Sequence, residues 1–293
     1  MPVTIVRPSI IIANYDDPLQ GWIDTLAASG GVILGISAGV MHFVRSSPTA
    51  IIDFIPCDFV SNQILVQTAF TAMDPTPNLN VIHSATTTRR PLTVPEVRVH
   101  ILKYSKYTPW YQNLSRVWAY PIPSTKAWKF AVGVTETLPL TVGKLYANAS
   151  GNEKLAKQLQ MLSVISDKMY TMQTIFHHFI GNTWQFANSL SDRAWTAMSP
   201  EERKEFKIDV TIIDWNIAMR NHIFGLRRFY IHEDIVDPND HQQLLQKTQI
   251  DWFHDLHVAY TASSNLKTRS IKTYYREIVS QQNFNAYVAY WTR

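Results

Sequence analysis

Short runs of β-branched residues alternate with helically spaced apolar residues over roughly the first hundred positions of the chain. Residues 3–6 predict a buried strand, and residues 79–83 predict a second one. After a turn at residues 53–58, Asp58 is placed to N-cap a helix. Residues 93–96 have the capping-box spacing and predict the start of another helix. The order strand, helix, strand, helix predicts part of an α/β sheet.

Beyond about residue 105 the strand pattern fades and helical periodicity takes over. Residues 153–184 form the clearest helix, since their large apolar side chains recur every three or four positions. Ser199 has the position of an N-cap, with proline at the first helical position and glutamate at the third. Residues 215–224 predict a further short helix. We therefore expect an α/β region followed by a mainly α-helical one.

Composition favours a folded chain without the glycine-rich loops of a complete dinucleotide-binding enzyme. Hydrophobic residues make up 46% and charged residues 17% of the 293 positions, which favours a substantial core over disorder. Only 10 glycines occur, about half the usual frequency. Because the chain also enters its first strand directly after Met1, we expect an amino-terminal part of the fold to be missing.

Charge and cysteine content narrow the class of protein. The net charge is +4, but lysines and arginines are dispersed, so we expect no nucleic-acid partner. The single cysteine, Cys57, excludes an intrachain disulfide and a multi-cysteine metal site, and its apolar neighbours predict a buried thiol. No apolar run reaches the roughly 18 residues of a membrane span, and the first residues lack the basic region of a signal peptide.

One pentapeptide matches a catalytic motif. Residues 35–39 read Gly-Ile-Ser-Ala-Gly, the G-x-S-x-G of a nucleophile elbow, and residues 32–34 could form the strand that enters it. Ser37 would then be the nucleophile of a serine hydrolase. Two acid–histidine pairs lie downstream: Asp214 with His222, and Asp234 with His254. The favoured interpretation is that these small residues permit a close turn or helix contact, because so short a motif recurs by chance.

Other candidate sites carry weaker signals. The sequence contains neither G-x-G-x-x-G nor a P-loop, and no lysine follows a tyrosine by four residues, which argues against a self-contained reductase. Histidines at 177–178 and at 254 and 257 lack the spacing of H-E-x-x-H, so we predict no metal site. Residues 266–278 could lie on an anionic membrane, although a solvated helix face is favoured. Five side chains of the long helix are expected in the core, with a lipid-facing groove as the alternative: Met161, Met169, Met172, Phe176 and Phe179.

Several segments, in order from Met1 to about residue 237, carry a more specific resemblance. Residues 18–24 read P-x-x-G-W-x-D, and residues 53–62 follow D-x-x-P-V-D-x-V-x-N with Cys57 in place of valine. The remaining matches are residues 2–10, residues 206–210, Trp215 and residues 225–230. Together these segments resemble the alcohol-forming fatty acyl-CoA reductase family.

The resemblance implies an α/β fold, namely the carboxyl-terminal part of a Rossmann-like extended short-chain dehydrogenase domain, followed by a mainly α-helical domain of the male-sterility type. It also implies NADPH as cofactor and reduction of a long-chain acyl-CoA to a fatty alcohol, as in wax biosynthesis. Pro8, Ser9 and Ile10 would line the nicotinamide end of the cofactor site. Gly21 and Trp22 would lie near the acyl entrance. The phosphate loop and the Tyr/Lys pair lie upstream in the family, so we expect no catalytic residue in this chain.

Three regions follow from the resemblance: a partial Rossmann-like region at 1–125, a helical reductase domain at 126–240 and a polar helical tail at 241–293. We expect a fragment that is inactive alone. The alternatives are a non-catalytic acyl-binding or interaction remnant and, less favoured, the Ser37 hydrolase. By family, the protein would act on the cytoplasmic side of the peroxisome or endoplasmic reticulum, with peripheral membrane contact.

Overall fold

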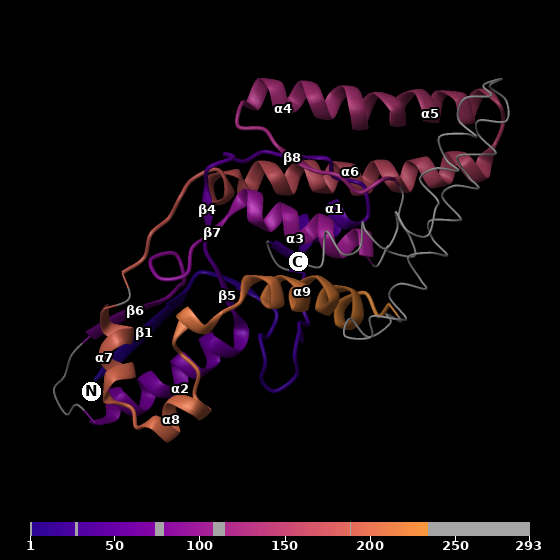
Figure 1. Ribbon diagram of the computed structural model, residues 1–293. Helices are drawn as coiled ribbons and strands as arrows, with labels where there is room; N and C mark the ends of the chain where they lie inside the picture. Colours follow the sequence, from indigo (N-terminus) through magenta and orange to yellow (C-terminus); the bar gives the residue numbers. More distant parts are fainter. Residues whose placement is uncertain (1, 27–28, 74–78, 108–114, 188, 234–293) are drawn as a thin grey trace, which may run out of the picture. The chain divides into compact units, whose positions relative to one another are not determined.

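The computed structural model describes residues 2–26, 29–73, 79–107, 115–187 and 189–233. They all belong to one unit, Met1–Leu244. Its strands lie mostly in the amino-terminal part of the sequence, and long helices follow (Figure 1). Among the helices of the described ranges, none has the length and apolar character needed to cross a bilayer.

Two parallel strand pairs form the predicted α/β region. β1 (Val3–Pro8) pairs with β6 (Leu79–Ser84) along its whole length. β2 (Ile10–Ile12) pairs with β5 (Phe54–Pro56). α2 (Cys57–Met73) connects β5 of one pair to β6 of the other and packs against β1. Both strands predicted from the sequence are therefore confirmed.

The expectation that residues 3–6 are buried is wrong, although they do form a strand. Val3 and Ile5 are 41% and 40% exposed. Thr4 points to the opposite face of the strand, where its hydroxyl hydrogen bonds with that of Thr71 in α2 at 2.6 Å. Among the described residues, β1 pairs with one neighbour, β6, and its main helical contact is with α2, so alternate apolar side chains stay open to solvent.

Residues 53–58 do not form the expected turn. All three residues of β5 are buried, and α2 begins immediately afterwards at Cys57. Asp58 lies inside the first turn of α2, so it is not the N-cap. Its carboxylate instead accepts hydrogen bonds from the backbone N–H groups of Tyr15, Asp16 and Asp17 at 2.9–3.2 Å. The helix dipole favours a carboxylate at this place, but its partners come from a distant loop.

Residues 32–34 are helical and do not form the strand expected before Ser37. They lie within α1 (Ser29–Ser37), which packs against α3 (Val94–Tyr107), α6 (Glu153–Ile180) and α9 (Trp215–Gly225). Because neighbours cover α1 on several sides, it is apolar all round and shows no helical period. Such a run cannot be told from a buried strand by pattern alone.

Two further pairs of strands are very short. β7 (Leu92–Thr93) is antiparallel to β4 (Ile51–Ile52), and β3 (Phe43–Val44) is parallel to β8 (Tyr120–Pro121). The capping box predicted at residues 93–96 is confirmed. The N–H of Thr93 donates to Oε2 of Glu96 at 2.8 Å, and the N–H of Glu96 donates to Oγ1 of Thr93 at 3.4 Å.

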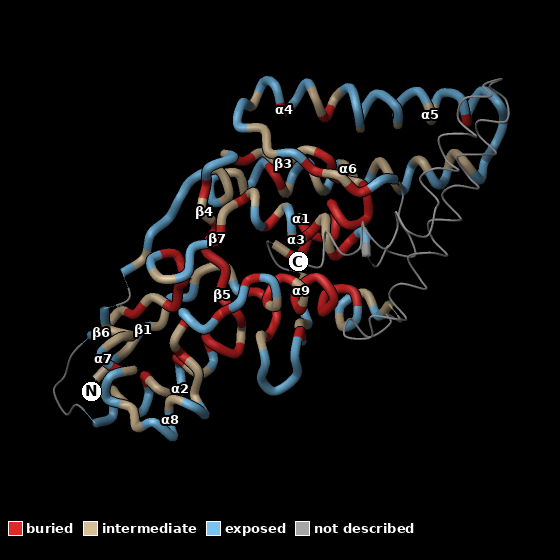
Figure 2. The backbone as a smooth tube through the Cα atoms, viewed as in Figure 1, coloured by how far each residue is buried: buried red, intermediate tan, exposed pale blue. Residues whose placement is uncertain are grey.

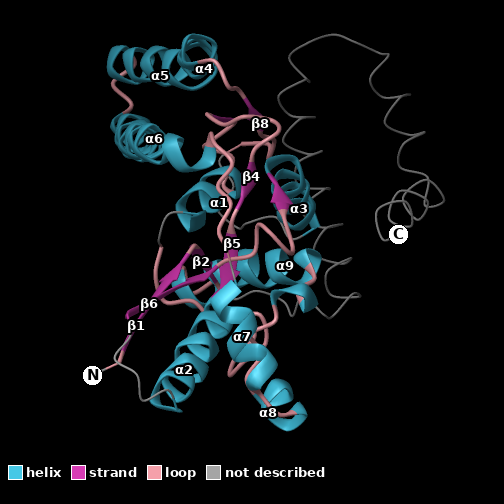
Figure 3. Ribbon diagram, turned by 90° about the vertical axis from the view of Figure 1, so that its left-hand side faces the viewer, coloured by secondary structure: helices cyan, strands magenta, loops and turns pink. Residues whose placement is uncertain are grey.

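A continuous helical rod packs against α6, and Figures 1 and 3 show the two side by side. The rod consists of α4 (Thr125–Val132), the π-helix η1 (Gly133–Thr137) and α5 (Leu138–Ala149). Trp128 anchors the rod: its side chain is fully buried and stacks on Tyr170 of α6 with ring centroids 4.9 Å apart. Within the described residues no strand follows β8, as the sequence pattern predicts.

Shorter helices complete the described unit: α7 (Ser189–Ala197), α8 (Pro200–Glu205), η2 (Val210–Ile212) and, after α9, η3 (Leu226–Tyr230). The capping box at Ser199 and the short helix at residues 215–224 are both confirmed. Figure 2 shows that buried residues gather in α1, β5 and α9. The core therefore joins the α/β region to the helices at the end of the described chain.

Candidate functional site

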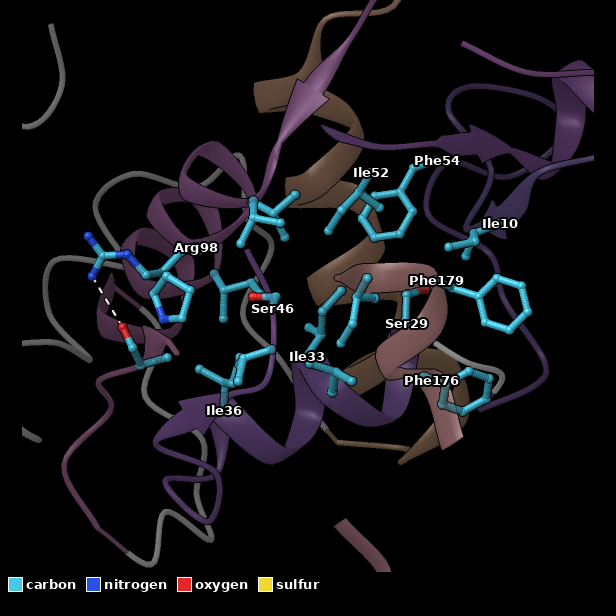
Figure 4. A pocket seen from close by; sticks show the side chains of 18 of the residues that line it. Ile10, Ser29, Ile33, Ile36, Ser46, Ile52, Phe54, Arg98, Phe176 and Phe179 are labelled. Carbon is cyan, nitrogen blue, oxygen red and sulfur yellow. Dashed lines mark hydrogen bonds between the residues drawn. The ribbon is translucent and has the colours of Figure 1, made fainter. Parts of the chain in front are cut away.

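An apolar cavity of about 460 Å³ lies between α1, α3, the short strands and the end of α6 (Figure 4). This volume falls within the range of about 300–1,000 Å³ that is typical of ligand pockets. The lining residues are Ser9, Ile10, Ile11, Ser29, Val32, Ile33, Ile36, Val44, Ser46, Ile52, Phe54, Val94, Val97, Arg98, Ile101, Ala119, Tyr120, Pro121, Phe176, Phe179 and Ile180. The lining of the cavity would suit a largely apolar group.

Few polar side chains line this cavity. Arg98 lies at one side of it, where its guanidinium donates to the carbonyl of Ala119 at 3.2 Å and lies 5.1 Å from the ring centre of Tyr120. Ser46 is fully buried, and its hydroxyl has no hydrogen-bond partner in the described part of the chain. In Figure 4 this hydroxyl lies among the apolar side chains between Arg98 and Phe179. It is therefore available to a ligand oxygen.

The predicted nicotinamide segment, Pro8 to Ile10, borders the cavity. Ser9 and Ile10 line it, whereas Pro8 ends β1 and is not among the lining residues. The N–H of Ser9 donates to the carbonyl of Ser84 at 3.0 Å, so the segment is fixed to the end of the neighbouring strand β6. Its role in cofactor binding stays a prediction.

Asp53 organises the backbone around this segment, a role that the sequence did not reveal. Its buried carboxylate accepts a hydrogen bond from the hydroxyl of Ser9 at 2.8 Å. The same carboxylate accepts bonds from the N–H and hydroxyl groups of both Thr86 and Thr87. Asp53 therefore ties the start of β2 to the loop after β6. A pair of adjacent threonines after a strand was the available signal, but nothing local identifies their acceptor.

The predicted substrate-binding residues, Gly21 and Trp22, lie elsewhere in the unit. Neither lines the cavity, and Trp22 is 41% exposed. Gly21 adopts a φ of 75°, and its carbonyl oxygen lies so near Gly225 that a Cβ added there would be 1.8 Å from it. Two segments that resemble the reductase family, residues 18–24 and 225–230, therefore meet through their glycines. Their part in acyl binding stays a prediction.

His222, one of the nominated catalytic histidines, is a buried structural residue. Burial lowers its pKa to about 3, so the imidazole is neutral at physiological pH. The N–H of Ala13 donates to its Nδ1 at 3.2 Å, which leaves the ring proton on Nε2, 3.4 Å from the hydroxyl of Ser29. Asp214, its nominated partner, instead caps α9 by accepting from the N–H of Asn216.

The structure does not support the serine hydrolase. Ser37 ends a helix rather than following a strand, it is buried, and its hydroxyl accepts a hydrogen bond from Ser105 at 2.8 Å. Asp214 accepts from the N–H of Asn216 and His222 accepts from that of Ala13. Asp234 and His254 lie outside the described residues, as do His257 and the basic stretch 266–278. The nucleophile elbow expected at residues 35–39 is therefore corrected to a helix end packed in the core.

The apolar side chains of α6 divide between core and cavity. Met169 and Met172 pack against the core as expected, but Met161 is 64% exposed and the expectation for it is wrong. Phe176 and Phe179 line the cavity, which favours the alternative of an apolar groove at this end of α6. Cys57 is half-buried rather than fully buried, and that burial raises the pKa of its thiol.

Comparison with known proteins gives a consistent family. Two family models, both described as male sterility protein, match the chain, an NAD-binding one at residues 1–64 and a second at residues 135–233. Fatty acyl-CoA reductase 1 of Xenopus laevis and of Homo sapiens are each 24% identical over 233 residues, which cover 80% of this chain and 44% of the relative. The chain belongs to the fatty acyl-CoA reductase family.

The family assignment confirms the resemblance and the coarse fold. Human fatty acyl-CoA reductase 2 is 22% identical over 245 residues, or 84% of this chain and 46% of the relative. The chain thus spans less than half the length of the curated fatty acyl-CoA reductases it matches. The NAD-binding match indicates a Rossmann-like extended short-chain dehydrogenase fold and a nicotinamide cofactor. The long helices after residue 125 agree with the predicted helical carboxyl-terminal region.

Proposed function

We propose that the chain supplies the acyl-binding part of an alcohol-forming fatty acyl-CoA reductase, with the apolar cavity holding the alkyl chain of a long-chain acyl-CoA. The observation that carries the proposal is the cavity itself, whose walls are mostly isoleucine, valine and phenylalanine. An alkyl chain offers no hydrogen bonds, so a lining with few polar groups suits it, and its burial contributes about 0.8 kcal/mol per methylene.

The position of residues 8–10 sets the direction of the bound acyl group. β1 and β6 end side by side there, and ligands of open parallel sheets bind beyond the carboxyl ends of the strands. NADPH, when bound, would supply the hydride. With the nicotinamide beside Ser9 and Ile10, the thioester lies at that end of the cavity. The alkyl chain then runs past Ile36 towards Arg98, which limits the length of chain accepted.

The residues that line the cavity bind and orient the substrate, whereas proton transfer to it needs a tyrosine with a neighbouring lysine. Reduction of a thioester to an alcohol takes two hydrides: the first gives the aldehyde with release of coenzyme A as its thiol, and the second reduces the aldehyde to the alcohol. A tyrosine beside a lysine would donate the protons. The sequence has no lysine four residues after a tyrosine, and the described residues around the cavity include no such pair. We therefore expect that the 293-residue chain binds long-chain acyl-CoA but does not oxidise NADPH with it.

Palmitoyl-CoA binding, followed by titration calorimetry, tests the proposal. Phe179 lines the cavity on α6 and is half-exposed, so Phe179→Glu places a carboxylate beside the alkyl chain with little risk to the fold. We expect a loss of affinity of about tenfold or more, equivalent to at least about 1.4 kcal/mol. Ile175→Glu is the matched control, because Ile175 is an exposed apolar residue of the same helix that does not line the cavity.

Equal affinity in Phe179→Glu and Ile175→Glu, or no binding by the unmodified chain, would refute the assignment of the cavity. Oxidation of NADPH by the purified chain in the presence of palmitoyl-CoA would refute the expectation that the chain binds acyl-CoA without reducing it. The assignment of the cavity would remain intact. The two parts of the proposal therefore fail separately.

A further inference from the structure

The helical rod α4–η1–α5 is apolar on two opposite sides. The side that faces α6 and the core carries Trp128, Val132 and Ala147, all of which are buried. The opposite side carries six large apolar side chains that are 47–73% exposed. We name these residues the outer stripe: Phe130, Val134, Leu138, Val142, Leu145 and Tyr146.

The π-helix η1 keeps the outer stripe on one side of the rod. Its first four members are spaced by four residues, and in an α-helix each such step turns about 40° beyond a full turn. Over the length of the rod this drift would carry the stripe round the helix. The N–H of Leu138 donates to the carbonyl of Gly133, five residues earlier, so η1 takes up an extra residue per turn and offsets the drift. Pro139 follows directly and cannot donate to the carbonyl of Thr135.

The polar surface around the outer stripe is cationic. Lys126, Lys129 and Lys144 lie on the rod itself. The single acid of the rod, Glu136, is turned inward: its Oε1 accepts the N–H of His42 at 3.0 Å, and its side chain is 10% exposed. The facing helix α6 adds three lysines and two acids, at positions 154, 157 and 168 and at 153 and 167. An exposed apolar stripe beside lysines is the pattern of helices that lie in a membrane interface.

We propose that the outer stripe is a membrane-contact surface, with the rod lying parallel to an anionic lipid surface and its apolar side chains inserted between the headgroups. The lysines decide between lipid and a second copy of this chain as the occupant. Two copies joined by their outer stripes would bring Lys126, Lys129 and Lys144 of each against those of the other, whereas an anionic bilayer neutralises them. The surface is separate from the acyl cavity and does not depend on the proposed reductase role.

Vesicle sedimentation with the full chain tests this surface. We expect binding to vesicles of phosphatidylcholine with phosphatidylserine, weaker binding to phosphatidylcholine alone, and loss of the difference at high salt. The variant Val142→Gln with Leu145→Gln should reduce the coefficient for partition onto these vesicles about tenfold or more. Two apolar side chains are then no longer transferred from water into the lipid surface. Ile64→Gln with Leu65→Gln is the matched control, since it removes from α2 two apolar side chains that are about half-exposed.

Circular dichroism and sedimentation velocity make the outcomes distinct. All substituted positions are about half-exposed or more, so both double variants should keep the helical signal of the unmodified chain. The proposal is supported if only the outer-stripe variant loses vesicle binding. It is overturned if the unmodified chain does not bind vesicles, if both variants bind as well as it does, or if the outer stripe instead holds a dimer that Val142→Gln with Leu145→Gln dissociates.

Discussion

Substitution of Gly225 by alanine tests the contact that joins the loop at residues 18–24 to α9. Gly225 ends α9, and its helical backbone would accept alanine without strain. The obstacle is the Gly21 carbonyl: the added Cβ would lie 1.8 Å from its oxygen and 2.9 Å from its carbon. We therefore expect Gly225→Ala to destabilise the fold, even though alanine is the better helix former.

The geometry gives an approximate magnitude. To reach even 3.0 Å, the shortest separation that real Cβ atoms show, the Gly21 oxygen must retreat by about 1.2 Å. Gly21 cannot swing away freely, because its N–H donates to the carbonyl of Asn14 at 2.9 Å. Overpacking costs about 1–3 kcal/mol in general, and we take the upper part of that range, about 2–3 kcal/mol, because the added Cβ meets backbone atoms; greater helix propensity returns about 1 kcal/mol. The net loss in free energy of unfolding is then roughly 1–2 kcal/mol.

Gly133→Ala is the matched control, because the same atoms are added where they meet nothing. Gly133 is also helical, but no atom lies within 4 Å of the position of its added Cβ. Alanine there should raise the free energy of unfolding by up to about 1 kcal/mol. Urea unfolding followed by circular dichroism measures both variants under identical conditions. If the free energy of unfolding falls in Gly225→Ala and rises in Gly133→Ala, the difference reports the steric contact with Gly21 and not the helix propensity of alanine.

The result that would refute this reasoning is a Gly225→Ala variant as stable as Gly133→Ala. It would mean that the loop at residues 18–24 is not held against α9 in solution. A loss in both variants would point instead to a general cost of replacing glycine in this chain.

Two further changes probe buried ionisable groups. Glu233→Gln should lower the free energy of unfolding by about 2–4 kcal/mol, because the guanidinium of the buried Arg227 then loses the carboxylate that accepts its Nε and Nη2 donors at 2.7 and 2.8 Å. Urea unfolding measures it, with Glu201→Gln on the surface of α8 as control, and equal stabilities would contradict it. For His222, the folded pKa of about 3 lies below its ordinary value of 6.5, so its contribution is complete above pH 6.5 and is lost as pH falls towards 3, by up to roughly 5 kcal/mol. His222→Asn keeps an acceptor for the Ala13 N–H without titrating, so the stability difference between the two proteins should shrink on acidification; a constant difference would contradict the assignment.

Local signals in the sequence predicted local structure well. The capping boxes at Thr93 and Ser199 are each contained within four residues, so the pattern alone identified both helix starts. The strands at residues 3–6 and 79–83 and the helix at residues 215–224 follow from short-range periodicity in the same way. The family segments added what periodicity could not, namely the kind of fold to which these elements belong.

The errors arose where tertiary contacts override the local pattern. Asp58 has the residue type of an N-cap, but the backbone of Tyr15 and its neighbours recruits the carboxylate. Residues 32–34 are apolar because α1 is surrounded by helices, and the same composition would suit a buried strand. The cavity escaped prediction because its walls come from seven or more separate elements, and no single segment records that Ser46 and Phe179 face one space.

The hydrogen bond between Ala13 and His222 has a consequence for how the protein is made. The two residues are separated by 209 positions, and the contact between Gly21 and Gly225 spans a similar length of chain. At about 5–20 residues per second, a ribosome reaches α9 roughly 10–40 s after the segment that α9 must cover. During that interval the nascent segment at residues 10–23 cannot make its native contacts with α9. Helices such as α6 can form from their own residues meanwhile, but the core that unites both parts of the described chain closes only when α9 has emerged.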